Sequence, residues 1–169
     1  MKLKYISWFP AFLIMVIIFY FSSKPATSSG ESSLMISRHL LSTYENITDQ
    51  SYDVTKKQEV LSKLDYIVRK SAHFIEYMVL AASLFFHFTV WGNGLKGRVS
   101  LSILITCVYA ATDEFHQTFV EGRSGQISDV LLDSCGAATG AFLCLLLVLI
   151  HKKCQNKRGK SQGVGSKTV

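Results

Sequence analysis

Charge is scarce in this chain of 169 residues: Asp, Glu, Lys and Arg together supply 18% of it, whereas soluble domains carry about a quarter. Proline is rarer still, at two residues, and eleven glycines are far fewer than a collagen-like chain requires. None of the four cysteines lies in residues 22–70, the longest polar stretch, so no disulfide framework holds that stretch. Hydrophobic residues, by contrast, make up 49% of the chain. This composition excludes a soluble enzyme and indicates a protein that lies largely in lipid.

Four apolar runs occupy residues 5–21, 71–90, 99–119 and 127–150. A helix that crosses a bilayer needs about 20 residues, with a range of about 17–25, and all four runs are long enough. Only a helix satisfies its own backbone hydrogen bonds within one segment, as the lipid interior demands. The predicted fold class is therefore all-α, an integral membrane bundle of four transmembrane helices.

The first run also has features of a signal peptide, with Lys2 and Lys4 before it and a small, polar stretch from Ser22 to Gly30 after it. Signal peptides have apolar regions of about 7–15 residues, and this run is longer and keeps bulky aromatic residues to its end. We therefore expect it to remain as a membrane helix, with cleavage as the alternative.

The distribution of basic residues predicts that both termini are cytoplasmic. With that orientation, the inner segments 1–4, 91–98 and 151–169 hold ten Lys and Arg, whereas the outer segments 22–70 and 120–126 hold eight in a longer stretch. Basic residues concentrate near the cytoplasmic ends of membrane helices. We expect a transmembrane domain over residues 5–150, followed by a basic cytoplasmic tail over 151–169.

The long outer loop carries helical patterns of its own. A weak apolar stripe runs from Leu34 to Tyr44, and a stronger one from Val60 to Val68 has charged residues on the opposite side. The second stripe predicts an amphipathic helix that lies at the membrane surface and runs into the second span. The alternative is a lid over an outward-facing site. We expect the lipid bilayer to be the main partner, with a lipid-linked substrate or a lipoglycopeptide as a further one. We expect no nucleic acid, because the basic tail interleaves no aromatic residue and no binding fold is available.

Ionisable residues inside the spans gather at one depth. Glu76, Asp113 and Asp133 each lie about six residues from the outer end of a predicted span, so at ~1.5 Å per residue all three lie roughly 9 Å below the outer surface. Charged groups in lipid cost several kcal/mol and tend to face the bundle interior. The candidate catalytic residues are His73, Glu76, Asp113, Glu114, His116 and Asp133. The candidate substrate-binding residues are Arg69, Tyr77, Gln117, Arg123 (also a counter-ion to the carboxylates) and Asp129.

Several interpretations of this cluster remain open. The polar side chains can pair with one another and only stabilise the bundle, or they can form a site for a substrate, an ion or a proton. They can also bind a divalent metal such as Zn²⁺ or Mn²⁺, although their spacing matches no strong metal motif. A histidine with carboxylates also suits acid–base chemistry on a lipid-linked headgroup. A transporter is less favoured, because no charged residue continues the path through the inner half. Gly136 and Gly140 form a GxxxG motif that favours close helix packing beneath the aspartates.

The same stretches resemble those of the VanZ-like family of small bacterial membrane proteins. The motifs that carry the resemblance are residues 21–25 (Phe-Ser-Ser-Lys-Pro), 69–77 (Arg-Lys-Ser-Ala-His-Phe-Ile-Glu-Tyr), 113–119 (Asp-Glu-Phe-His-Gln-Thr-Phe), the pair Gly122-Arg123, and Asp129, Asp133 and Gly136. Glu121 departs from the proline that is more typical before Gly-Arg. The resemblance implies a multi-pass cell-membrane protein, associated with low-level resistance to the glycopeptide teicoplanin or with envelope modification. The alternative function is a membrane-embedded hydrolase or transferase that acts on a lipid or cell-wall precursor headgroup.

Overall fold

The computed structural model describes residues 2–164, and side chains from residue 4 to residue 156. Every regular element in this part of the chain is a helix, so the predicted all-α class is confirmed. The helices are α1 (Lys2–Ile6), α2 (Phe9–Ser22), α3 (Ala26–Thr48), α4 (Val54–Val90), α5 (Leu95–Gln117) and α6 (Ile127–Val164).

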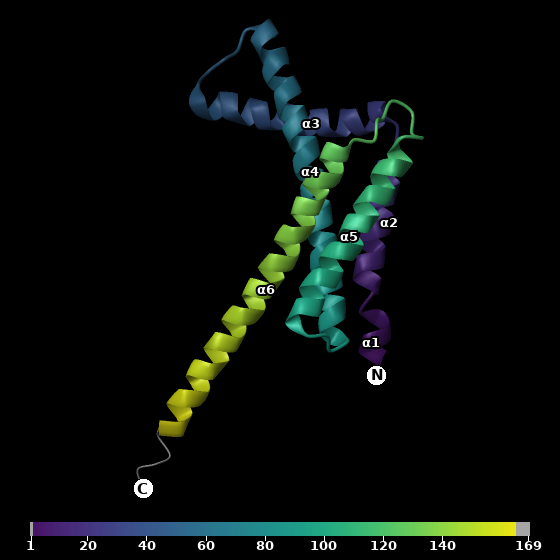
Figure 1. The fold of residues 1–169 in the computed structure, drawn as a ribbon. Helices are drawn as coiled ribbons and strands as arrows, with labels where there is room; N and C mark the ends of the chain where they lie inside the picture. The colour runs from purple at the N-terminus through teal and green to yellow at the C-terminus, as the bar shows by residue number, and fades with distance from the viewer. Residues whose placement is uncertain (1, 165–169) are drawn as a thin grey trace.

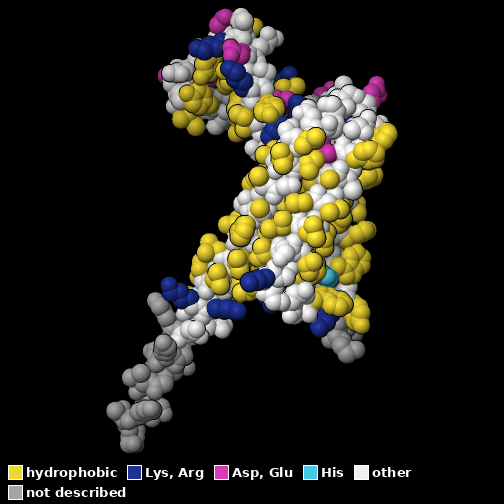
Figure 2. Space-filling view, viewed as in Figure 1, with side chains coloured by type: hydrophobic (Ala, Val, Ile, Leu, Met, Phe, Trp, Pro, Cys, Tyr) yellow, Lys and Arg dark blue, Asp and Glu magenta, His cyan; other side chains and the backbone are white. Residues whose placement is uncertain are grey.

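Four helical segments are long and apolar enough to cross a membrane, as predicted: Lys4–Ser22, Val54–Val90, Leu95–Gln117 and Ile127–Asn156. Helix α4 packs against α2, α5 and α6, and α5 also packs against α6, so α4 is the central element of the bundle (Figure 1). Hydrophobic side chains cover the length of the bundle, whereas charged side chains gather towards its two ends (Figure 2). An apolar exterior between two charged ends is the surface that a bilayer requires.

The first span differs from the single helix expected over residues 5–21. It consists of α1 and α2, which are separated by a turn at Ser7 and Trp8. Pro10 explains the break, because its ring lacks an N–H and clashes with the carbonyl four residues earlier, at Ile6. Ser7 closes the turn: its hydroxyl donates to the Lys4 carbonyl at 2.9 Å.

The GxxxG motif of α6 packs directly on the backbone of α4, which confirms the expected close approach. A Cβ atom at Gly136 would overlap the carbonyl of Phe74, and one at Gly140 would overlap the carbonyl of Met78. The two glycines and the two carbonyls are each four residues apart, so one stripe of α6 fits one stripe of α4. This contact holds the start of α6, with its aspartates, against α4.

Helix α3 lies across one end of the bundle (Figure 1). It is attached to the start of α4 by two contacts: Ser33 donates to Asp65, and Lys57 pairs with Glu45 at 2.8 Å. Its remaining apolar face is exposed, through Ile36, Leu40, Tyr44 and Ile47. The amphipathic helix predicted to run into the second span is also confirmed, because α4 is continuous from Val54 to Val90.

The last helix continues beyond residue 150, where the apolar run ends, as far as Val164. It extends away from the other helices at the end of the bundle opposite α3 (Figure 1). The basic tail predicted over 151–169 is therefore helical over its first part. Residues 165–169 lie outside the described residues, as do the side chains beyond residue 156.

Candidate functional site

The predicted site residues come from four places that meet near the α3 end of the bundle. Helix α4 supplies Arg69, His73, Glu76 and Tyr77; the last turns of α5 supply Asp113, Glu114, His116 and Gln117; the connection between α5 and α6 supplies Arg123; and the first turns of α6 supply Asp129 and Asp133. All of them except Arg69 are buried or half-buried. The sequence therefore identified side chains that face the protein rather than the lipid.

Asp113 joins α4 to α5. The Tyr77 hydroxyl and the Gln117 side-chain amide each donate to its Oδ2 at 3.1 Å. All three side chains are buried, and Tyr77 is fully so. Two donors on one carboxylate oxygen stabilise the charge that burial would otherwise disfavour.

Glu114 shapes the connection between α5 and α6 rather than a cavity. Its Oε2 accepts a hydrogen bond from the backbone N–H of Gln126 at 3.0 Å. The preceding Gly125 lies so close to the α5 backbone that a Cβ there would overlap the carbonyl of Glu114. The connection is therefore folded back onto the end of α5.

Two ion pairs at this end include residues that the sequence analysis missed. Lys70 on α4 pairs with Asp129 on α6, and Arg69 pairs through Nη2 with Asp65, which also accepts from Ser33. The signal for Lys70 was present, because it directly follows Arg69 in the sequence and lies at the same end of the bundle as Asp129. The partner of Arg69 was missed because Asp65 lies in a stretch that hydropathy assigned to the loop.

Arg123 forms no direct ion pair with a carboxylate among the described residues, although Asp113, Glu114 and Glu76 are near enough to act on its charge. Its Nε donates to the carbonyl of Lys24 at 2.9 Å, and its Nη2 donates to the carbonyl of Phe21 at 3.0 Å. Carbonyls at a helix C-terminus lack partners and attract cations, which is the physical reason for this placement at the end of α2. Burial lowers the pKa of Arg123, but a guanidinium remains charged at neutral pH.

Asp133 and His116 lie apart from these contacts. Asp133 is completely buried, and neither of its carboxylate oxygens has a hydrogen-bond partner among the described residues. The His116 ring lies against Phe19 with 4.8 Å between the ring centroids, and its Nδ1 has no described partner either. Such atoms cost free energy unless a proton, water or ligand satisfies them.

Two hollows meet at this end of the bundle. The first, of about 250 Å³, lies between α3, α4, the α5–α6 connection and the start of α6, and we call it the polar hollow. The second, of about 290 Å³, lies between α2, α3, α4 and Arg123, and we call it the mixed hollow because apolar side chains form much of its wall. Both are lined by Ser29, Arg69, His73 and Arg123.

The predicted residues divide clearly between these hollows and the bundle interior. Gln117 and Asp129 line the polar hollow, and Glu76 lines the mixed hollow, in addition to the three shared predicted residues Arg69, His73 and Arg123. The remaining five do not line either hollow: Tyr77, Asp113, Glu114, His116 and Asp133. Of these, Asp113 is connected to the polar hollow through its hydrogen bond from Gln117.

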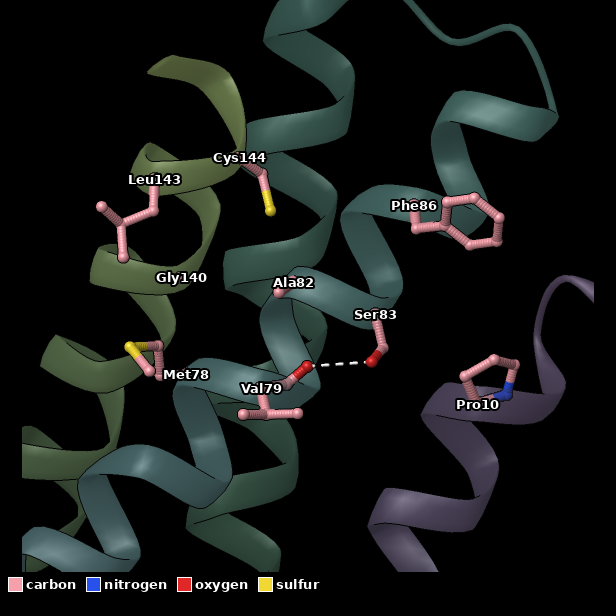
Figure 3. Close-up of a pocket in the computed structure, with 9 residues that line it drawn as sticks. All are labelled: Pro10, Met78, Val79, Ala82, Ser83, Phe86, Gly140, Leu143 and Cys144. Carbon is pink, nitrogen blue, oxygen red and sulfur yellow. Dashed lines mark hydrogen bonds between the residues drawn. The ribbon is translucent and has the colours of Figure 1, made fainter. Parts of the chain in front are cut away.

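A third hollow, of about 410 Å³, lies further along the bundle between α2, α4 and α6 (Figure 3). Its floor is formed by small residues, including Ala82, Ser83 and Gly140, and no charged residue lines it. The Ser83 hydroxyl donates to the Val79 carbonyl at 2.9 Å, so its polar atom is already satisfied. This surface suits lipid chains rather than chemistry.

No group of three or more His, Cys, Asp or Glu side chains in the described part of the chain is arranged to hold a metal ion. The histidines and carboxylates instead contact different partners.

The fold and the buried polar residues together define a multi-pass helical membrane protein with a charged cavity at one end of its bundle. The chain belongs to the VanZ/LLP1 family, whose model matches residues 7–149. The matched range includes α2 to α5, most of the first and fourth spans, and every predicted site residue. Searches of curated proteins and of solved structures found no match.

Proposed function

We propose that this VanZ-like membrane protein acts at the outer leaflet of the cell membrane and lowers susceptibility to glycopeptides of the teicoplanin type, or otherwise modifies the envelope. The proposal includes the orientation with both termini cytoplasmic, which the density of basic residues supports. In that orientation the α3 end of the bundle, with both hollows, faces outwards.

The observation that carries this proposal is the junction of the two hollows at Arg69, His73 and Arg123. Charged groups near lipid are costly, and a role in bundle stability alone does not require them to line cavities. The junction lies beneath α3, whose apolar face is exposed at the same end. A ligand at the lipid–water boundary would therefore meet both a charged cavity and an apolar helix.

A second candidate function is that of a membrane-embedded hydrolase or transferase acting on a lipid or cell-wall precursor headgroup. His73 and Glu76 favour it, because they lie one helical turn apart and line the same hollow. Histidine and carboxylate side chains are the groups that enzymes most often use as general acids and general bases.

Loss of two hollow-lining side chains, His73 and Glu76, or of the neighbouring Asp113 should remove function without removing the protein. In cells that lack the gene, the native protein should restore the original susceptibility to teicoplanin-type glycopeptides, whereas His73→Ala, Glu76→Gln and Asp113→Asn should leave it at the level of the deletion. The matched controls are His39→Ala and Glu59→Gln, because both side chains are exposed and line neither hollow. These controls should behave as the native protein.

Protein abundance in the membrane fraction must be measured for every variant. If the three site variants are degraded, the cluster only stabilises the bundle; if they are abundant and still restore native susceptibility, the proposal is wrong. The enzymatic alternative predicts turnover of lipid-linked precursors by purified native protein and none by His73→Ala. The absence of turnover by native protein, with normal complementation in cells, would eliminate the enzyme and retain the first proposal.

A further inference from the structure

The mixed hollow has two chemically different sides. Arg69, His73 and Arg123 form its charged side, next to the polar hollow. Ile18 and Phe21 of α2 and Ile36 of α3 form an apolar side. A cavity with one charged and one apolar side fits an amphiphile better than a free ion or a purely apolar molecule.

The charged side presents more positive than negative charge to a ligand. Arg123 uses Nε and Nη2 for backbone carbonyls and forms no direct ion pair with the described residues, although Asp113, Glu114 and Glu76 act on its charge from further away. Arg69 pairs with Asp65 through Nη2, and about half of its side-chain surface is exposed. Glu76 is the acidic residue of the mixed hollow, seven residues along α4 from Arg69, which is about 10 Å in a helix. An anion at Arg69 is therefore separated from this carboxylate, whose charge acts instead on Arg123.

The apolar side of the mixed hollow continues to the outer surface of the bundle. Phe21 and Ile36 line the hollow, yet each is about half exposed. A hydrocarbon chain that starts at the charged side can therefore follow these side chains and leave the cavity into surrounding lipid. A cavity that only bound a water-soluble anion would not need this apolar exit.

We propose that the joined hollows bind an amphiphile with a phosphate-bearing headgroup, the phosphate at Arg69 and Arg123 and the hydrocarbon chain along Phe21 and Ile36. Each of these guanidiniums keeps N–H groups that donate to no described residue, and such groups bind phosphate oxygens by charge-assisted hydrogen bonds. The polar hollow then receives whatever the phosphate carries on its other side. This inference rests on the proposed function, for which it names the class of ligand.

Isothermal titration calorimetry of the purified full chain in maltoside micelles tests the proposal with octyl phosphate, inorganic phosphate and octanol as probes. Octyl phosphate should bind with a Kd at least about tenfold below those of the other two, because it alone engages both sides. Arg69→Gln and Arg123→Gln should each weaken octyl phosphate binding about tenfold, which is the effect of losing one charge-assisted hydrogen bond. Ile36→Asn should weaken octyl phosphate and leave inorganic phosphate unchanged.

Each variant has a matched control. Arg98→Gln removes an arginine whose Nε likewise donates to a backbone carbonyl, that of Asn93, but which lines neither hollow. Lys63→Gln removes an exposed cation of α4, and Ile47→Asn alters the same face of α3 outside the hollow. All three controls should bind octyl phosphate as the native chain does.

Three outcomes would overturn the proposal. Equal affinity for octyl phosphate and inorganic phosphate would indicate an anion site without a place for the chain. Equal affinity for octyl phosphate and octanol, or no effect of Arg69→Gln in folded protein, would indicate partitioning into the micelle. The binding results are independent of the complementation test of cellular function. If native protein and variants complement as predicted but native protein binds no octyl phosphate, the proposed ligand class is wrong and the proposed function remains.

Discussion

At the scale of single residues, the site shows two ways of placing a carboxylate within a membrane bundle. Asp113 receives two hydrogen bonds from neighbouring side chains, whereas Asp133 receives none from the described residues. An unpaired, fully buried carboxylate is costly when charged, so Asp133 depends on a proton or on a bound partner to a greater extent than Asp113 does. The two aspartates are therefore expected to respond differently to substitution.

Tyr77→Phe isolates the contribution of one hydrogen bond to Asp113. It should lower the free energy of unfolding by about 0.6–1.7 kcal/mol, the range measured for interhelical hydrogen bonds in membranes. Tyr109→Phe is the matched control, because that hydroxyl also bonds to another helix, donating to the Met15 carbonyl at 2.6 Å. Thermal unfolding in detergent should detect similar losses for both, and complementation should fail only for Tyr77→Phe. Equal complementation by both variants would place Asp113 among purely structural residues.

At the scale of helices, small residues decide how close two elements approach. Gly136 and Gly140 bring α6 against the backbone of α4, and this approach was predictable because the spacing alone places both glycines on one face. The break between α1 and α2 was missed, although its cause, Pro10, is visible in the sequence. Hydropathy averages over a window, so it does not register the loss of a single backbone hydrogen bond.

Gly140→Ala should separate α6 from α4 and destabilise the bundle. The added methyl group would overlap the Met78 carbonyl, and backbone atoms cannot move aside as a flexible side chain can. Overpacking of this kind costs about 1–3 kcal/mol, which a lowered midpoint of thermal unfolding in detergent would report. Gly97→Ala in α5 is the control, because its Cβ would meet nothing closer than 3.8 Å and alanine favours a helix over glycine. A Gly140→Ala midpoint equal to that of Gly97→Ala would contradict the tight contact.

At the scale of the whole molecule, the candidate site residues are concentrated at one end of the bundle. Helix α3 and the α5–α6 connection lie at that end, and α6 extends beyond the bundle at the other (Figure 1). The linings of both hollows come from the same end as α3. Which end faces the outside of the cell determines whether the cavity meets the envelope. The proposed orientation is therefore the assumption on which the function most depends.

Labelling with a membrane-impermeant maleimide tests this orientation. The first variant retains Cys154 as its single cysteine, and this thiol is exposed in the structure. It should react with the maleimide only after cells are lysed, because the basic residues near it favour the cytoplasmic side. Ser42→Cys, introduced into α3 with all native cysteines replaced, should react in intact cells. Reaction of Cys154 in intact cells, with protection of residue 42, would reverse the orientation and remove the outer-leaflet function.

The sequence by itself determined the helical class, the four spans, the family and the set of buried ionisable residues, because hydropathy, helical period and motif spacing are properties of local segments. Only the tertiary structure decided the partners: Arg123 binds the end of α2 instead of a carboxylate, Lys70 pairs with Asp129, and Asp65 anchors both Arg69 and α3. These contacts join residues far apart in the chain, and they depend on how each helix is rotated and how closely it approaches its neighbours. The hollows arise for the same reason, since a cavity belongs to the packing of several helices and not to any one of them.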